Sequence, residues 1–373
     1  MPKRDDTNDT VWEIGEHTLG KHRVMNAYLG GWFPVISRYA GRVLFIDGFA
    51  GPGRYKGGEE GSPIIALKAL RDHPYRSNMK AEFVFLFIEK DDERAAVLRQ
   101  EIAPMVAELG STVKSEVVTG IFDEKMTEVL NTVAEQKTRL APAFVMVDPF
   151  GIAQTPMSVI ARILENPKSE VFISYMWEWI NRFKGQPEFD TPLTELYGTD
   201  AWKGYAEMPK PDQKVFLYDL YESQLRNAGA KHVTHFELLK GERHVYTIFF
   251  ATKHPKGMDL MKASIWKADK TGNYQFRGRD ESELMLDIDQ PNLEPFQLEI
   301  QAAFAGTDVS IEEVTEWAMG DETDYHSGHV KSALKALEAK GIVSNVRRAG
   351  EEKRRKGTFP DSTTFHVAKP PRG

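Results

Sequence analysis

Short apolar runs alternate with amphipathic segments through the first 250 residues of the chain. The runs are rich in Val, Ile and Phe, as in strands buried on both faces, and helical apolar spacing separates them. The expected strands span residues 42–46, 82–88, 116–118, 143–147 and 170–175. Helices are expected at 16–37, 63–71, 91–109, before 137 and at 156–165. This alternation predicts a parallel sheet covered by helices on both faces.

Two further apolar runs, 232–239 and 245–252, follow a predicted helix at 212–228. Only residues 240–244 join them, and so short a link cannot cross over between parallel strands. The runs therefore predict an antiparallel hairpin at the end of the sheet. The fold class is α/β, a Rossmann-like sheet of seven strands that is mostly parallel with this terminal hairpin. That arrangement is typical of methyltransferases more than of all-parallel dinucleotide folds.

The C-terminal part has a different pattern. Pro291 and Pro295 flank a boundary, after which helices are expected near 294–305, 310–318 and 326–340. Strands at 342–346 and 363–367 then enclose a basic loop, and this order is that of a winged helix-turn-helix. We expect a flexible N-terminus at 1–14, a methyltransferase-like domain at 15–285 and a winged helix-turn-helix at 290–373. Residues 177–209 lack a clear period and are interpreted as an insertion over the carboxyl edge of the sheet.

Charge is unevenly distributed along the 373 residues, whose net charge is −7. Residues 280–324 contain fourteen acids and no Lys or Arg, whereas 325–373 contain eleven basic and four acidic residues. The negative net charge does not exclude a nucleic-acid partner, because binding depends on the local charge, and residues 325–373 are basic. The absence of cysteine excludes disulfides, thiolate metal sites and cysteine nucleophiles. No signal peptide, membrane span or metal-ligand spacing is recognised, so we expect a cytoplasmic protein without a metal.

The candidate chemistry lies where the predicted parallel strands end, which is where open α/β sheets bind ligands. Glu89 could accept hydrogen bonds from two ribose hydroxyls of a nucleoside cofactor. Phe122 could pack on the adenine, and Asp123 could contact the adenine amino group. Asp47 would face the ammonium of S-adenosylmethionine. The expected cofactor-binding residues are Asp47, Phe49, Ala50, Gly51, Gly53, Glu89, Phe122 and Asp123.

A nicotinamide cofactor fits this loop less well. Dinucleotide folds place the ribose acid roughly 20 residues beyond a G-x-G-x-x-G loop. Here Glu89 lies 36 residues beyond Gly53, and the loop lacks that glycine order.

Asp148, Pro149 and Phe150 are the predicted catalytic residues. The segment resembles the Asp/Asn/Ser-Pro-Pro-aromatic loops of amino-methyltransferases, in which the acid accepts the amine hydrogens and the ring stacks on the base. Phe150 stands in place of the second proline, so the match is partial. An extruded base would be received by Trp177, Trp179 and Arg182. The alternative is that these aromatic residues form core beneath the insertion.

Basic residues in the C-terminal domain are candidates for phosphate contacts. They comprise the helix residues Lys331 and Lys335 and the loop residues Arg347, Arg348, Lys353, Arg354, Arg355 and Lys356. A solvated charged loop is the alternative, since Glu351 and Glu352 dilute the positive charge.

Residues 45–55 with Gly61-Ser62-Pro63-Ile64 resemble the three-Cys-motif partner protein family, TcmP. Residues 147–151 and the segment from Lys21-His22 to Tyr28-Leu29 fit the family as well, and the resemblance covers roughly residues 15–270. It implies a class I methyltransferase-like fold and a prokaryotic or phage setting. It also implies a partner, the separately encoded three-Cys-motif protein, which looks like a radical-SAM enzyme.

Two functional hypotheses follow. The first is an S-adenosylmethionine-dependent methyltransferase that acts on DNA or RNA, at an exocyclic base amine, together with the three-Cys-motif partner. The alternative is a catalytically silent methyltransferase-like subunit that binds DNA and recruits a partner enzyme. A dinucleotide oxidoreductase is a third and more distant interpretation.

Overall fold

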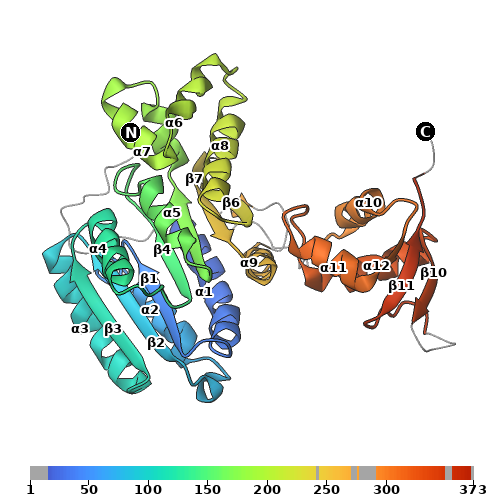
Figure 1. Ribbon diagram of the computed structural model, residues 1–373, viewed down its shortest axis with the longest axis horizontal. Coiled ribbons are helices and arrows are strands. Elements are labelled where there is room, and N and C mark those ends of the chain that lie inside the picture. The colour runs from blue at the N-terminus through green and yellow to red at the C-terminus, as the bar shows by residue number, and fades with distance from the viewer. Residues whose placement is uncertain (1–15, 241–242, 270–274, 277–290, 349–354, 371–373) are drawn as a thin grey trace. The chain divides into compact units, whose positions relative to one another are not determined.

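The computed structural model describes residues 16–240, 243–269, 275–276, 291–348 and 355–370 (Figure 1). The chain divides into two compact units. The first comprises Met1–His254 and Gln275–Ser282, and the second comprises Pro255–Tyr274 and Glu283–Gly373.

The first unit is built on one sheet with the strand order β3-β2-β1-β4-β5-β7-β6-β8. The strands are β1 (Arg42–Asp47), β2 (Glu82–Glu89), β3 (Val113–Thr119), β4 (Ala143–Val147), β5 (Ser169–Tyr175), β6 (His232–Lys240), β7 (Arg243–Thr252) and β8 (Gln275–Phe276). Strands β1 to β5 pair in parallel, whereas β7 is antiparallel to both β5 and β6. The predicted seven-stranded, mostly parallel sheet with a terminal hairpin is confirmed. The two-residue β8, parallel to β6, was not predicted.

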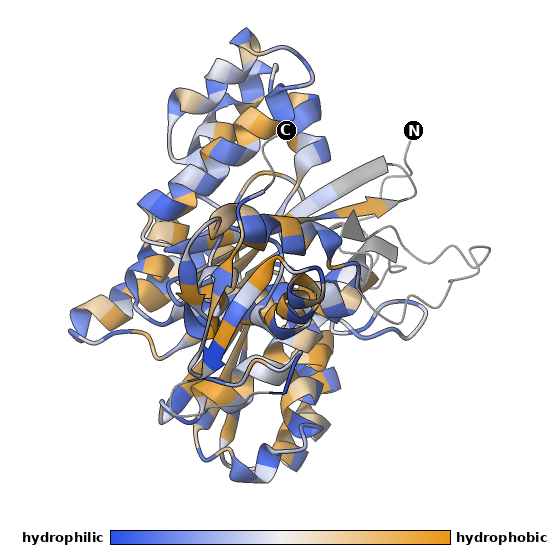
Figure 2. Ribbon diagram, turned by 90° about the vertical axis from the view of Figure 1, so that its right-hand side faces the viewer, coloured by the Kyte–Doolittle hydropathy of each residue, from blue (hydrophilic) through white to orange (hydrophobic). Residues whose placement is uncertain are grey.

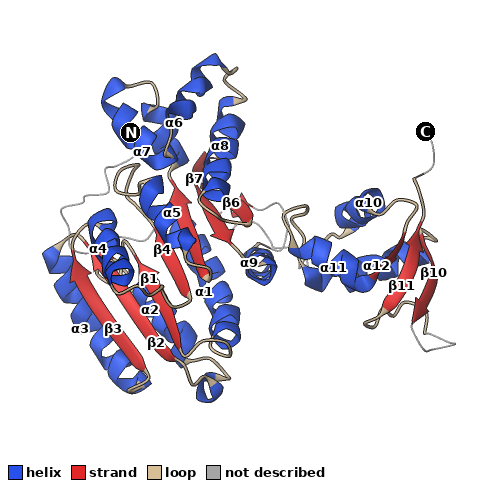
Figure 3. Cartoon of the chain, in the orientation of Figure 1, coloured by secondary structure: helices blue, strands red, loops and turns tan. Residues whose placement is uncertain are grey.

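Helices cover both faces of this sheet. They are α1 (Glu16–Ile36), α2 (Ser62–Arg71), α3 (Asp92–Leu109), α4 (Phe122–Glu135), α5 (Met157–Glu165), α6 (Trp177–Phe183), α7 (Asp190–Tyr197) and α8 (Gln213–Asn227). Helix α2 packs on α1 and α3, whereas α5 packs on α4, α7 and α8. Figure 3 shows α4 and α5 in front of the strands and α1 and α3 behind them. The helices are banded with hydrophilic and hydrophobic residues (Figure 2), as amphipathic helices over a buried sheet require.

The register brings the strand ends that matter for function to one edge. Asp47, the last residue of β1, pairs with Phe87 of β2 and Met146 of β4. Glu89, the last residue of β2, pairs with Thr119 at the end of β3. The loops that follow these strands therefore begin side by side. The segment after β5 contains α6, α7 and the 3₁₀ helices η2 (Pro187–Phe189) and η3 (Asp200–Glu207).

The second unit combines helices with a small antiparallel sheet of order β10-β11-β9. Its elements are α9 (Pro255–Ala268), α10 (Glu294–Ala303), β9 (Asp308–Ser310), α11 (Ile311–Met319), η4 (Ser327–His329), α12 (Val330–Ala339), β10 (Val343–Arg348) and β11 (Thr363–Val367). Ser310 begins α11 with a capping box, in which its hydroxyl accepts from the Glu313 amide and the Glu313 carboxylate accepts from the Ser310 amide. The strand β9 is too short to have been expected from sequence.

Helix α9 packs with the second unit although it follows β7 after only two residues. Buried Lys262 of α9 donates hydrogen bonds to the carbonyls of Ala318, Gly320 and Thr323, at 2.6, 2.7 and 2.9 Å. Carbonyls at the end of a helix have no partner within the helix, so this ammonium caps α11. The expected boundary near 290 did not anticipate this association.

The same helix also contacts η4, which directly precedes α12. The carboxylate of Asp259 accepts from the amide and the hydroxyl of Ser327, at 2.7 and 2.6 Å. Trp266 donates to the carbonyl of Asp324 at 2.9 Å and packs on the ring of Tyr325. The turn between α11 and α12 is therefore tied to α9 at several points.

None of the helices in the described part of the chain is long and apolar enough to cross a membrane.

We predict that Lys262→Met destabilises the second unit by about 2–4 kcal/mol, because buried carbonyls lose hydrogen bonds to a charged donor. Native-state hydrogen exchange at the amides of α11 and of the following turn measures the effect. Lys267→Met, on the exposed side of α9, is the matched control and should change stability by less than about 0.5 kcal/mol. Equal exchange in the two variants would show that the cap is not stabilising.

Candidate active site

The loop after β1 lies directly on the ring of Phe122. A Cβ added to Gly48 would stand 2.4 Å from Cδ2 of that ring, so only glycine allows the approach. Phe122 is 1% exposed, and its ring centre lies 5.6 Å from that of Phe49. The side chain thus supports the loop from the core. Its expected contact with an adenine stays a prediction.

The next glycines of the loop make a tight turn. Gly51 and Gly53 have φ values of 63° and 88°, in the left-handed region that side chains disfavour. The Gly61 amide donates to the Gly53 carbonyl at 2.7 Å, and a Cβ on Gly61 would lie 2.9 Å from that oxygen. The turn therefore closes at the start of α2.

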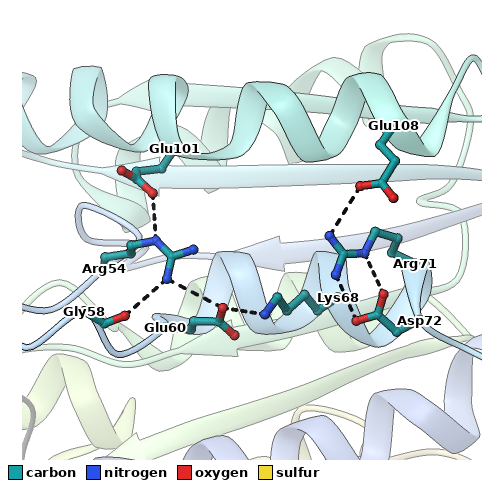
Figure 4. A network of polar contacts seen from close by, with 8 residues as sticks. All are labelled: Arg54, Gly58, Glu60, Lys68, Arg71, Asp72, Glu101 and Glu108. Atoms are coloured by element: carbon teal, nitrogen blue, oxygen red, sulfur yellow. Dashed lines mark hydrogen bonds and ion pairs between the residues drawn. The ribbon is translucent and has the colours of Figure 1, made fainter.

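A network of charged side chains holds the outer side of this loop (Figure 4). Arg54 lies 2.9 Å from Glu101 of α3 and 3.6 Å from Glu60, and it donates to the Gly58 carbonyl at 3.2 Å. Lys68 of α2 lies 2.6 Å from Glu60. These contacts fix the loop to both neighbouring helices. They were not predicted, because ion pairs between separate elements leave no periodic signal in the sequence.

Asp47 is fully buried at the beginning of the loop. Its Oδ1 accepts from the Phe49 amide at 3.0 Å, whereas Oδ2 has no hydrogen-bond partner among the described residues. Burial raises the pKa of Asp47 to about 6, and the nearby charge of Asp148 adds to the rise, whereas the Ser62 side chain, the Phe49 amide and the charge of Lys21 act against it. Within the described part of the chain, one oxygen of this buried carboxylate therefore lacks a hydrogen-bond donor.

Glu89 and Asp123 lie at the two neighbouring strand ends. Glu89 Oε2 accepts from the Gly51 amide at 2.8 Å, and Oε1 accepts from the Asp91 amide at 3.0 Å. Asp123, in the first turn of α4, has a buried Oδ1 without a partner in the described structure. The edge therefore offers unsatisfied acceptors at Asp47 and at Asp123. A ligand with N–H donors at both ends fits this set.

Asp148, which follows β4, forms an ion pair with Lys21 of α1 through its Oδ2. The lysine side chain is 3% exposed and the aspartate side chain 26%. Burial opposes ionisation of Asp148, but the charge and hydrogen bond of Lys21 outweigh it and hold the pKa of Asp148 below its usual value. Sequence reasoning missed this partner. The available signal was a lysine on the buried stripe of α1, four residues before Met25.

Two aromatic side chains beside this acid are exposed to solvent. Phe150 is 58% exposed and Trp179 of α6 is 44% exposed. Gly151 has a φ of 103°, and a Cβ there would lie 3.7 Å from the Trp179 ring, so the loop rests against α6. Pro149, which lies between Asp148 and Phe150 in the sequence, is buried.

The other predicted target-binding residues of α6 differ in exposure. Arg182 is exposed, with its guanidinium 5.1 Å from the centre of the Phe183 ring. Trp177 is partly buried and packs edge-on against Tyr218 at 5.8 Å between ring centres. Trp177 therefore contributes to packing, whereas Trp179 and Arg182 face solvent.

The predicted nucleic-acid-binding residues belong to the second unit. Lys331 and Lys335 are exposed on α12, and Lys331 lies 3.7 Å from Asp361. Arg347, Arg355 and Lys356 are also exposed. The side chain of Arg348 and the residues Lys353 and Arg354 lie outside the described residues. Across the described ranges, no three His, Asp or Glu side chains are grouped to hold a metal ion.

No protein-family model and no curated protein matches the chain. An O-methyltransferase from Bacillus cereus, solved in complex with SAH, aligns at 14% identity over 61% of this chain and 80% of its own, with a TM-score of 0.34. The O-methyltransferase TomG from Streptomyces achromogenes, solved with SAM, aligns at 14% identity over 65% and 92%, with a TM-score of 0.34. The METTL16 MTase domain aligns at 15% identity over 60% and 66%, with a TM-score of 0.30. Alignments at this level do not decide an activity for this chain.

We predict that Asp47→Asn stabilises the ligand-free protein at pH 7.5. The pKa of Asp47 is higher in the folded protein than in the unfolded chain. As pH rises from about 4 to about 6, Asp47 therefore ionises first in the unfolded chain, and the free energy of unfolding falls. The asparagine variant lacks this loss, so it should be more stable by up to about 3 kcal/mol at pH 7.5 and little changed at pH 4.

Urea unfolding at the two pH values measures the difference. Asp219→Asn, at an exposed position of α8, is the control for the removal of a carboxylate charge and should change stability by less than about 0.5 kcal/mol. If Asp47→Asn were less stable than the wild type at pH 7.5, the ionised carboxylate would not be destabilising at this position.

Proposed function

We propose that this protein is an S-adenosylmethionine-dependent methyltransferase that acts on an exocyclic amine of a nucleic-acid base. One observation carries the proposal. A buried carboxylate with an unpartnered oxygen, Asp47, begins a loop at the same sheet edge at which Asp148 lies beside the exposed ring of Phe150.

The cofactor would lie along the ends of β1, β2 and β3. Asp47 Oδ2 would accept a hydrogen from the ammonium group, and Asp123 Oδ1 would accept one from the adenine amino group. Each oxygen of Glu89 accepts one backbone hydrogen bond and keeps a lone pair for a ribose hydroxyl. When bound, S-adenosylmethionine supplies an electrophilic methyl group.

The target would enter beside β4. Asp148 would accept an amine hydrogen, which turns the nitrogen lone pair toward the methyl donor. Phe150 and Trp179 offer faces on which a base can stack. Methylation of a neutral amine depends mainly on this positioning, and the nitrogen can release its surplus proton to water afterwards. These residues therefore suit an amine better than an acceptor that must first be deprotonated.

The second unit supports a polymeric substrate. Its element order from α10 to β11 is that of a winged helix, with β9 completing the small sheet. In that interpretation α12 is the recognition helix, and Lys331 and Lys335 lie on its exposed side. We propose that these lysines and the basic loop between β10 and β11 contact phosphates of DNA or RNA.

The resemblance to the TcmP family adds a proposed partner, a three-Cys-motif protein, which would bring the cysteines that this chain lacks. The second candidate function is accordingly a catalytically silent subunit that binds DNA and recruits such an enzyme. The ion pair between Lys21 and Asp148 favours it, because one oxygen of the proposed amine acceptor is already engaged.

Calorimetric titration with S-adenosylhomocysteine tests the cofactor site. We expect binding by the wild-type chain and at least about tenfold weaker binding by Asp47→Ala and by Glu89→Ala, since each loses a charged hydrogen-bond acceptor. Asp219→Asn should bind like the wild type. No binding by the wild-type chain would refute the methyltransferase proposal.

Transfer of labelled methyl groups to DNA and RNA then separates the two candidates. Methylated exocyclic amines in the digested product support the enzyme. Cofactor binding without transfer to any nucleic acid, together with co-purification of a partner enzyme, supports the silent subunit.

The salt dependence of nucleic-acid affinity tests the second unit. Lys331→Ala and Lys335→Ala should each weaken binding of duplex DNA and lower the slope of log K against log salt by about one, as expected for one lost phosphate contact. Lys267→Ala, at an exposed position of α9, is the matched control. Fluorescence anisotropy from 50 to 200 mM salt measures the slope, and an unchanged slope in both variants would remove α12 from the interface.

A further inference from the structure

Helix α1 carries a lysine on the side that it buries. Lys21 is four residues before Met25 and seven before Tyr28, and both of these are fully buried. Lys21 itself is 2% exposed. An ammonium group in such a position is destabilising unless it is paired, so its partner is central to its role.

The partner, Asp148, is the more open member of the pair, with 26% of its side chain exposed against 3% for Lys21. The lysine engages Oδ2 from the protein interior. A target that approaches from solvent therefore meets the carboxylate, and the lysine is shielded from it. The target competes for the remaining acceptor capacity of Asp148.

Among the described residues, Ser174 also lowers the pKa of Asp148 through a hydrogen bond, but its hydroxyl carries no charge. The Tyr246 ring of β7 has its centre 5.7 Å from Nζ, and the Tyr55 ring lies 6.2 Å from that of His22. Burial, reinforced by the charge of Lys21, lowers the pKa of His22 to about 3, so His22 is neutral at physiological pH. Asp47 is a second acid near the pair and repels Asp148. The positive charge that offsets Asp148 thus comes from α1.

We propose that Lys21 is a positioning residue that sets the hydrogen-bond polarity of the target site. It keeps Asp148 ionised, so that Asp148 accepts a hydrogen and selects an amino group. Without Lys21, burial would raise the pKa of Asp148 against the remaining hydrogen bond of Ser174 and so favour its protonated form, which donates to a keto oxygen or a ring nitrogen instead. This inference rests on the proposed function for its substrate, but the effect of Lys21 on Asp148 is a property of the ligand-free chain.

A double-mutant cycle in the ligand-free protein tests that property. The variants are Lys21→Met, Asp148→Asn and the combination of both, unfolded in urea between pH 4 and pH 8.5. In the wild type, Asp148 has a lowered pKa and contributes stability that is present above about pH 4 and lost at lower pH. In Lys21→Met we expect the pKa of Asp148 to be raised in the folded protein. The contribution of Asp148 to the free energy of unfolding should then fall as pH rises.

Asp148→Asn should therefore destabilise the wild type at pH 8, where it leaves Lys21 unpaired, and stabilise the Lys21→Met protein. The double variant holds a neutral pair and serves as the control for folding. The same effect of Asp148→Asn in both backgrounds at every pH would overturn the inference.

The pH profile of methyl transfer is the second test. Lys21→Met should shift the acidic limb of the profile upward by at least about one pH unit, with about tenfold less transfer on that limb. An unchanged profile in a protein that transfers methyl groups would overturn the inference alone. If the wild type transfers none, the proposed function fails, and the cycle still decides the role of Lys21.

Discussion

A buried carboxylate, Asp47, a partly buried carboxylate, Asp148, and a buried ammonium, Lys21, lie where β1 and β4 end. Charges removed from water are stable only when they are paired, so Asp148 depends on Lys21 and ties α1 to the sheet edge. Asp47 has a raised pKa, and one of its oxygens has no hydrogen-bond partner in the described part of the chain. Asp47 and Asp148 together carry one more negative charge than Lys21 offsets, so a ligand with one positive charge would complement them. This excess of negative charge destabilises the ligand-free protein, and it is also the feature to which the proposed cationic cofactor would bind.

Much of the first unit could be predicted because its signals are local. Apolar runs of strand length, separated by helical periods, identify a parallel sheet, and the short link before β7 requires a hairpin. Parallel strands place their carboxyl ends at one edge, so Asp47, Glu89 and Asp148 could be grouped without coordinates. The glycines at 51 and 53 were also predictable, since a tight turn after a strand needs left-handed residues.

The unpredicted features depend on contacts between distant segments. Lys21 and Asp148 are 127 residues apart, and a lysine in a helical period is normally assigned to the surface. The packing of Gly48 on the buried ring of Phe122 was likewise not predicted, because the two residues follow different strands. Lys262 reaches carbonyls 56 to 61 residues away. Such pairings are decided by packing, which periodicity does not encode.

The place of α9 in the chain has a consequence for how the protein is made. During synthesis the strands β1 to β7 emerge first, then α9, and only afterwards α11 and α12, on which α9 packs. The buried side of α9 therefore remains without its partners until about fifty more residues have been synthesised, while strands β1 to β7 can already fold. A C-terminal fragment that begins near 290 would lack Lys262, Asp259 and Trp266. The second unit can form completely only as the last part of an unbroken chain, or as a fragment that begins at α9.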